Sequence, residues 1–257
     1  HIYHAAALIS FNNIDKNKMI ETNATGTANV IDLALKHNIH RLCFVSSIAT
    51  LGSNNDVPID ETDLWSWDNQ SGYAISKYLA ELEVYRGFAE GLSGFIVNPS
   101  LIIGPGSWDS GVGTIIKKSK LGMPFYPPGS CGLIDVKDLI DIMMKLMDSD
   151  VNNERFIINS THMSYKELMT IIAQSLRVQI PYIKLNKTLL KVLIGLDVMI
   201  NKIRGKRIEL STDAVKYTTS EIILNSQKIN TLIDVDYRDM KKSITECVDL
   251  FVKKGLH

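Results

Sequence analysis

A tyrosine and a lysine four residues apart carry the clearest chemical signal in the sequence. Tyr73 and Lys77 are the ends of the run YAISK, and side chains at i and i+4 share one face of a helix, with Cβ atoms roughly 5–6 Å apart. An ammonium at that separation favours the charged form of a phenol, which is otherwise a poor base because its ordinary pKa is about 10. The pair therefore predicts a tyrosine that moves the proton of an alcohol.

The same spacing occurs twice, and its surroundings separate the two cases. Tyr237 and Lys241 form the second pair. Tyr73 lies 26 residues after Ser47, which ends the apolar run RLCFVSS, whereas Tyr237 has no such run before it. We interpret the first pair as functional and the second as accidental.

The elements that must position this pair alternate between apolar strands and helices. Each strand is apolar on both faces, which is typical of a parallel sheet covered by helices, and right-handed crossovers then give a doubly wound α/β fold. We expect a strand and its exit loop within residues 2–11, strands at 41–47 and 94–103, and helices at 18–37 and 73–90. Ligands of such sheets bind at the carboxyl ends of the strands. These ends fall at Ala5–Ala7, Ser46–Ser47 and Asn98–Gly104.

The pattern changes after residue 107. We expect helices at 135–147, 164–176, 187–203 and 241–253, and a strand at 154–159. This predicts two regions: residues 1–106 as the dinucleotide-binding part and residues 107–257 as a mixed region that completes the sheet and binds substrate in a small, mostly helical lobe. The most apolar tract, Leu189 to Ile200, is shorter than the ~20 residues that span a bilayer, so we interpret it as a buried or lid helix.

Composition excludes several classes of function. The chain has 257 residues, 45% of them hydrophobic, and a formal net charge of zero, so no basic field is available to recruit nucleic acid. His37 and His40 lack further ligands nearby, and no metal site is expected. The cysteines form no CxxC pair, which predicts neither a zinc site nor a disulfide framework and favours a cytoplasmic location. They are Cys43, Cys131 and Cys247.

Five segments in order make a family resemblance specific. The segments HAAALISF, NATGTANVIDLA, FVSSIATLG, YAISKYLAE and NPSLIIGPG resemble the extended short-chain dehydrogenase/reductase family, the NAD-dependent epimerase/dehydratase group. The chain is similar to dihydroflavonol reductases, 3β-hydroxysteroid dehydrogenase-like enzymes and nucleotide-sugar epimerases. Later segments such as ERFIINSTHMSYKELMTIIA extend the resemblance over nearly the whole chain. It implies a Rossmann-like fold and an NAD or NADP cofactor.

The resemblance also implies roles for single residues. Tyr73 matches the catalytic acid/base, Lys77 the lysine that tunes it and bonds the nicotinamide ribose, and Ser47 the hydroxyl that holds the substrate oxygen. Counting back from Gly52 favours Ser47 over Ser46 for that role. The residues implied in cofactor binding are Ala5, Ala6, Ala7, Asn23, Ser46, Tyr73, Lys77, Pro99, Leu101 and Ile102.

One family feature has no match. Members begin with a Gly-rich GxxGxxG turn before a helix that receives the pyrophosphate. The runs Gly104–Gly106 and Gly111–Gly113 lack the third glycine and the right position. With His1 as the first residue, this predicts that the sequence is truncated at its N-terminus and lacks the segment that selects NAD or NADP.

Three functions remain open at this point. The first is an oxidoreductase that passes hydride between a nicotinamide and a secondary alcohol or ketone, and the apolar tract Leu189 to Ile200 favours an apolar or steroid-like carbonyl substrate. The second is a nucleotide-sugar epimerase or dehydratase with a transient oxidation, and the third is a non-catalytic binding module. The resemblance further implies a homodimer through the helices that carry Asn23 and Tyr73 and a small-molecule substrate, and the length of the apolar tract predicts no transmembrane segment.

Overall fold

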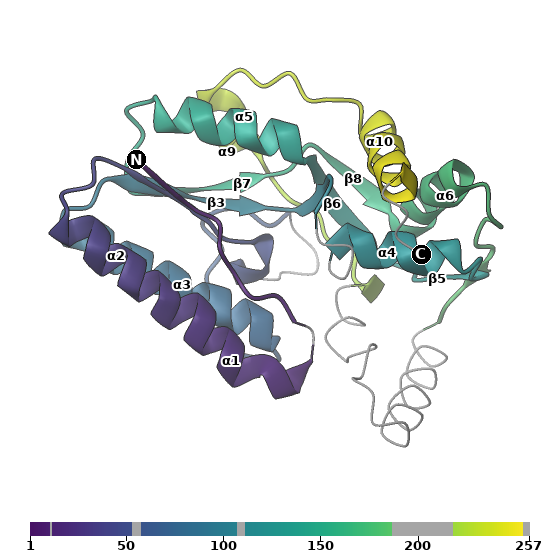
Figure 1. Ribbon diagram of the computed structural model, residues 1–257, viewed down its shortest axis with the longest axis horizontal. Coiled ribbons are helices and arrows are strands. Elements are labelled where there is room, and N and C mark those ends of the chain that lie inside the picture. Colours follow the sequence, from purple (N-terminus) through teal and green to yellow (C-terminus); the bar gives the residue numbers. More distant parts are fainter. Residues whose placement is uncertain (11, 53–57, 107–110, 187–217, 254–257) are drawn as a thin grey trace. The chain divides into compact units, whose positions relative to one another are not determined.

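The computed structural model describes residues 1–10, 12–52, 58–106, 111–186 and 218–253, and the chain divides into two compact units (Figure 1). Unit 1 comprises His1–Ser100, Leu139–Ile158 and Leu224–Val235. Unit 2 comprises Leu101–Asp138, Asn159–Ile223 and Asp236–His257. Unit 1 therefore takes two segments from beyond residue 106, and the functional division at that residue stays a prediction.

Unit 1 is built on a parallel sheet of four strands in the order β1-β2-β3-β7. These strands are β1 (Ile2–His4), β2 (Leu42–Val45), β3 (Gly94–Pro99) and β7 (Glu154–Ile158). Every neighbouring pair is parallel, and β3 is buried along its whole length. Apolar residues on both faces are what such a doubly covered sheet requires. The expected parallel α/β sheet is thus confirmed.

Helices cover both faces of this sheet. On one face lie α2 (Gly26–Lys36) and α3 (Gly72–Ala89), side by side, and on the other lies α5 (Val136–Met147) from Leu139 onward (Figure 1). Ile31 of α2, Phe44 of β2 and Val84 of α3 share one buried cluster with no exposed surface. Packing of this apolar cluster fixes α3 on the sheet, which matters because α3 carries Tyr73 and Lys77.

The helix expected at residues 18–37 contains an unexpected π-helical turn. The chain runs through η1 (Asn13–Asp15), α1 (Lys16–Ile20), the π-turn η2 (Glu21–Thr25) and then α2. Such turns inside α-helices occur frequently at functional sites. Here the turn has Asn23 at its centre, with its side chain buried.

Unit 2 contains a separate three-stranded sheet in the order β4-β6-β8. Its strands are β4 (Leu101–Ile103), β6 (Ser130–Asp135) and β8 (Thr161–Ser164), and a further short pair joins β5 (Phe125–Tyr126) to β9 (Ile183–Lys184). Within the described residues, three helices enclose its apolar core. They are α4 (Gly111–Lys120), α6 (Tyr165–Leu176) and α10 (Met240–Lys253).

The single strand predicted at residues 94–103 is wrong, because the chain forms two strands there. β3 ends at Pro99 and pairs with β7, whereas β4 begins at Leu101 and pairs with β6. Between them, the backbone N–H of Ser100 donates to the carbonyl of Ile158. The apolar run is continuous in sequence, but its pairing partners change at this residue.

Most other predicted elements are confirmed within a few residues. Ser164 caps α6 as expected, since its hydroxyl accepts from the backbone N–H of Glu167. The short helix α9 (Gln227–Leu232) packs against β7 in unit 1 and was not expected. The predicted helix at 187–203, with the apolar tract Leu189 to Ile200, lies outside the described residues. Among the helices that are described, none is both long and apolar enough to cross a bilayer.

Candidate active site

Helix α3 brings Tyr73 and Lys77 onto one face in its first two turns. Ser71 caps the helix, because its hydroxyl accepts from the backbone N–H of Ala74 at 3.0 Å. Gly72 lies so close to α1 that an added Cβ would meet side-chain atoms of Lys16 and Met19 at 3.1 Å. The start of α3 is therefore held on both sides, and the partly buried Tyr73 follows directly after it.

Lys77 is a buried cation aimed at the end of a strand. Its side chain is 2% exposed, its Nζ donates to the carbonyl of Val45 at 2.7 Å, and Nζ lies 4.4 Å from the ring centroid of Phe44. Burial lowers the pKa of Lys77 to about 8, while the negative charge of Glu81 acts in the opposite direction. Lys77 thus reaches β2 two residues before Ser47.

The two serines at the end of β2 have different surroundings. Ser47 caps the 3-10 turn η3 (Ile48–Thr50), its Oγ accepting from the backbone N–H of Ala49 at 3.2 Å. Ser46 is buried, its backbone N–H donates to the carbonyl of Val97, and its Oγ has no hydrogen-bond partner in the part of the chain that the structure describes. Which hydroxyl meets a substrate oxygen stays a prediction, with Ser47 favoured.

Asn23 fixes the segment that leaves β1. Its Oδ1 accepts from the backbone N–H of Leu8 at 2.7 Å, and its Nδ2 donates to the carbonyl of Leu8 and to Oγ of Ser76, both at 2.9 Å. The first turn of α2 contacts β1 itself, since Thr27 Oγ1 donates to the carbonyl of Asn23 and lies 2.9 Å from Nε2 of His4. Burial, and secondarily Lys77, lowers the pKa of His4.

A cavity of about 420 Å³ opens at the carboxyl end of β1. Small side chains leave room there, and a Cβ added at Gly26 would meet no atom within 4 Å. A dinucleotide needs this close approach to backbone, so the residues present fit the cofactor that the resemblance implied. The lining residues are His4, Ala6, Ala7, Leu8, Thr22, Gly26 and Val30; Ala5 is not among them.

The remaining predicted cofactor residues fall in different units. Pro99 ends β3 in unit 1, where it is buried and paired in register with Ile158. Leu101 and Ile102 begin β4 in unit 2 and are partly buried. The structure brings Asn23, Lys77 and the end of β2 together within unit 1, while the place of Leu101 and Ile102 beside a nicotinamide stays a prediction.

Sequence reasoning missed a buried polar network beneath the site. Glu81, one turn after Lys77 on α3, has an exposed fraction of 1%. Its Oε1 accepts from Thr50 Oγ1 and from Asn98 Nδ2, each at 2.7 Å, and its Oε2 lies 3.7 Å from Nη1 of Arg155. The continuation of the i, i+4 spacing from Tyr73 through Lys77 to Glu81 is the signal that could have found it.

The second Tyr–Lys pair does not share this geometry. Tyr237 lies in the segment before α10, which begins at Met240, so it is not on the helix that carries Lys241. Burial and the charge of Asp138 raise the pKa of Tyr237 to about 12. That change makes its phenol a weaker acid, the reverse of what proton transfer near neutral pH needs.

The cysteines also lack reactive surroundings. Cys43, Cys131 and Cys247 are free and buried. Burial raises the pKa of both Cys43 and Cys131 to about 12, and a thiol is a poor nucleophile when it stays protonated.

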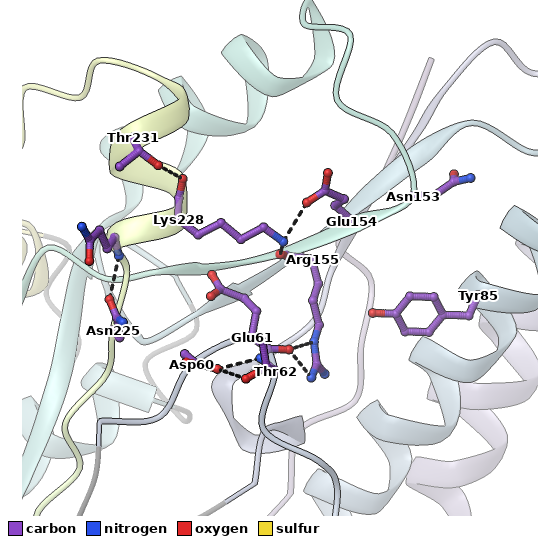
Figure 2. Close-up of a pocket in the computed structure, with 11 residues that line it drawn as sticks. Asp60, Glu61, Thr62, Tyr85, Asn153, Glu154, Arg155, Asn225, Lys228 and Thr231 are labelled. Carbon is purple, nitrogen blue, oxygen red and sulfur yellow. Dashed lines mark hydrogen bonds and ion pairs between the residues drawn. The ribbon is translucent and has the colours of Figure 1, made fainter.

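A larger cavity, of about 640 Å³, lies along β7 and does not include Ser47, Tyr73 or Lys77 (Figure 2). Its charged groups are already engaged. Lys228 Nζ lies 2.8 Å from Oε2 of Glu154, and Arg155 donates to the carbonyl of Glu61. Because these groups bind each other, we do not assign the chemistry to this cavity.

Comparison with known proteins identifies the family. The model of the NAD dependent epimerase/dehydratase family matches residues 1–159, and the chain belongs to that family. "Sterol demethylase protein B" of Methylococcus capsulatus is 26% identical over 175 residues, which cover 65% of this chain and 52% of that protein. "Putative dihydroflavonol 4-reductase" of Synechocystis is 25% identical over 264 residues, covering 99% of this chain and 76% of that protein.

The fold is also found among solved structures. The crystal structure of gox2253 has a TM-score of 0.81 and 24% identity, and the match covers 98% of this chain and 78% of that one. A likeness at this identity establishes the Rossmann-like fold and no more. The chain spans about half the length of the first relative above, so the activity of the whole protein is a matter for proposal.

Proposed function

We propose that the protein is an NAD(P)-dependent oxidoreductase acting on a secondary alcohol or ketone, with Tyr73 as its general acid/base. The observation that carries this proposal is the buried ammonium of Lys77, one helical turn after Tyr73 and bonded to the end of β2 at 2.7 Å. A positive charge held inside a protein next to a phenol favours its ionised form. Lysines are almost never fully buried unless they are paired, so a lysine with an exposed fraction of 2% is not expected on a helix face that has only a structural role.

Each residue has a separate part in the proposed reaction. The nicotinamide cofactor, when bound, supplies or accepts the hydride. Tyr73 gives its hydroxyl proton to the substrate oxygen during reduction and takes it back during oxidation. Lys77 favours the phenolate that is left behind, and Ser47 donates a hydrogen bond to the substrate oxygen, which carries growing negative charge during reduction.

The cavity beside Ala6 and Ala7 supports the cofactor part of the proposal. It lies at the carboxyl end of β1, and Asn23 fixes its wall by bonding both backbone groups of Leu8. The family name specifies NAD, while the choice between NAD and NADP is left to titration. The two relatives are named for a sterol and a dihydroflavonol, so apolar cyclic alcohols and ketones come first in the substrate panel.

The test is a turnover assay on the protein. Secondary alcohols and ketones are offered with each oxidised or reduced nicotinamide, and the absorbance of the reduced form is followed. Tyr73→Phe is expected to lower kcat by about 10²–10⁴-fold. Tyr78→Phe is the matched control, because it keeps the aromatic ring that stacks on Trp65 at 4.3 Å, and it should retain turnover.

The outcomes separate the reductase from an epimerase of the same family. A net change in the nicotinamide, lost in Tyr73→Phe and kept in Tyr78→Phe, supports the proposal. Isomerised nucleotide sugar without a net change in the nicotinamide would replace it with an epimerase. Equal turnover in wild type and Tyr73→Phe would remove Tyr73 from the chemistry.

We further propose that the protein forms a homodimer through α2 and α3. Leu33 on α2 and Leu82 on α3 are large apolar side chains with exposed fractions of 54% and 44%, and the two helices lie side by side in unit 1 (Figure 1). Replacing Leu82 with Glu should convert a dimer to a monomer in light scattering. A wild-type monomer would reject the proposal.

A further inference from the structure

Glu81 is a buried carboxylate that the proposed reaction does not use. It lies on α3 two turns after Tyr73 and one turn after Lys77, and its side chain is 1% exposed. Removing a carboxylate from water is energetically unfavourable unless partners satisfy it. A charge kept in that place therefore has to be explained by what it contacts.

One carboxylate oxygen of Glu81 is connected by hydrogen bonds to the segment that carries Ser47. Oε1 accepts from Thr50 Oγ1 and Asn98 Nδ2, each at 2.7 Å. Thr50 Oγ1 also lies 2.9 Å from the carbonyl oxygen of Ser47, and Asn98 Nδ2 lies 3.1 Å from that same oxygen. These three side chains join α3, η3 and β3 around the backbone of Ser47.

The other carboxylate oxygen of Glu81 is connected, through Arg155, to the loop between Ser47 and Tyr73. Oε2 lies 3.7 Å from Nη1 of Arg155. Arg155 donates through Nε and Nη2 to the carbonyl of Glu61, at 2.9 and 2.6 Å, and through Nη2 to the carbonyl of Asp63, at 3.0 Å. Figure 2 shows the guanidinium turned toward this loop, with the ring of Tyr85 on its other side.

We propose that Glu81 is a positioning residue for the candidate site: its buried carboxylate ties the Ser47 segment to α3 through Thr50 and Asn98, and ties the loop of residues 60–64 to α3 through Arg155. The inference rests on the proposed function, because the contacts of Glu81 would hold Ser47, Tyr73 and Lys77 at their positions for that reaction. A misplacement of about 1 Å in such a site can lower the rate by about 10²-fold.

The charge of Glu81 has a second consequence, for Lys77. Burial lowers the pKa of Lys77 to about 8, and Glu81 is the group that acts against this. The ammonium also donates to the carbonyl of Val45 and faces the Phe44 ring and His4 on β1, whose pKa is lowered by burial and by Lys77 itself; the proposed function adds the Tyr73 phenol, one helical turn away. Removing the charge of Glu81 should therefore lower the pKa of Lys77 further.

The variant Glu81→Gln separates charge from shape. The amide keeps an acceptor oxygen for Thr50 and Asn98 but removes the negative charge between Lys77 and Arg155. Glu83→Gln is the matched control: it makes the same change on the same helix, at a side chain 34% exposed and paired only with Arg86 among the ion pairs described.

The first readout is independent of turnover. Lysine side chains labelled with ¹³C are titrated by NMR, and the Lys77 signal is assigned by its loss in Lys77→Met. The wild type should titrate near pH 8, Glu81→Gln at a lower pH, and Glu83→Gln at the wild-type pH. A Glu81→Gln midpoint equal to or above that of the wild type would overturn the electrostatic part of the proposal.

The second readout is kinetic and uses Thr50→Val, which removes the bridging hydroxyl and leaves every charge in place. We expect its Lys77 titration to match the wild type and its kcat to fall about tenfold or more. Wild-type kcat in Thr50→Val would overturn the positioning role. If the wild type turns over no alcohol or ketone, the proposed function fails, while the NMR titration still decides whether Glu81 sets the charge of Lys77.

Discussion

Replacing Lys77 with methionine should make the protein more stable while it abolishes the proposed chemistry. Folding lowers the pKa of Lys77 from 10.5 to about 8, and each pKa unit corresponds to about 1.4 kcal/mol. Burial of the charged form therefore destabilises the folded protein by about 3 kcal/mol at neutral pH. Methionine has a similar length, carries no charge, and fits an apolar site.

Part of this gain is lost through contacts of the ammonium. Methionine cannot donate to the carbonyl of Val45, and the loss of such a hydrogen bond costs about 1 kcal/mol. The expected net stabilisation is about 2 kcal/mol. Because the folded pKa lies below the unfolded one, the unfolded chain binds more protons between about pH 8 and 10.5, and wild-type stability rises across that window. The advantage of Lys77→Met should be full below pH 8 and shrink above it.

The assay is urea unfolding followed by tryptophan fluorescence, at neutral pH and again near pH 10. Lys36→Met serves as the control, since Lys36 is exposed on α2 and its replacement should leave the unfolding midpoint unchanged. If Lys77→Met is less stable than the wild type at neutral pH, the interactions of the ammonium outweigh its desolvation, and the reasoning is refuted. The reasoning is also refuted if the stability advantage of Lys77→Met over the wild type is as large near pH 10 as at neutral pH.

Substitutions at three further positions test other parts of the structure. Ser47→Ala should lower kcat by about tenfold or more through loss of a hydrogen bond to the substrate oxygen, whereas Ser47→Thr should keep it; equal rates for both would exclude the hydroxyl. Gly52→Ala should destabilise the protein by about 1–3 kcal/mol in urea unfolding, because its Cβ would lie 2.6 Å from the carbonyl oxygen of Leu64. Asn23→Ala leaves both backbone groups of Leu8 without their buried partner and should weaken NADH binding in a fluorescence titration; unchanged affinity would separate this wall from the cofactor.

The helix with Tyr73 and Lys77 could be predicted because its signals are local. The i, i+4 spacing and the stop at Gly91 are both visible in the sequence, and Gly91 has the positive φ, +102°, that only glycine adopts readily. The buried strand before Ser47 could also be predicted, because its short apolar run is bounded by polar residues. These features depend on residues within one or two turns of each other.

The features that were missed depend on contacts between distant segments. Nothing in the run GFIVNPSLII marks Ser100 as the point where one sheet ends and another begins, because that is decided by pairing with β7 and β6. The network around Glu81 joins residues 17 to 74 positions apart, as with Asn98 and Arg155. A buried carboxylate cannot be recognised until its partners are placed around it.

The most direct test of the central claim is to follow the hydride itself. The protein is given reduced nicotinamide with deuterium on the transferring face of C4 and a ketone substrate, and the product is examined by mass spectrometry and NMR. We predict deuterium on the carbinol carbon, one oxidised nicotinamide per product, and loss of both in Tyr73→Phe but not in Tyr78→Phe. Isomerisation without net oxidation of the nicotinamide, or full transfer in Tyr73→Phe, would contradict the account.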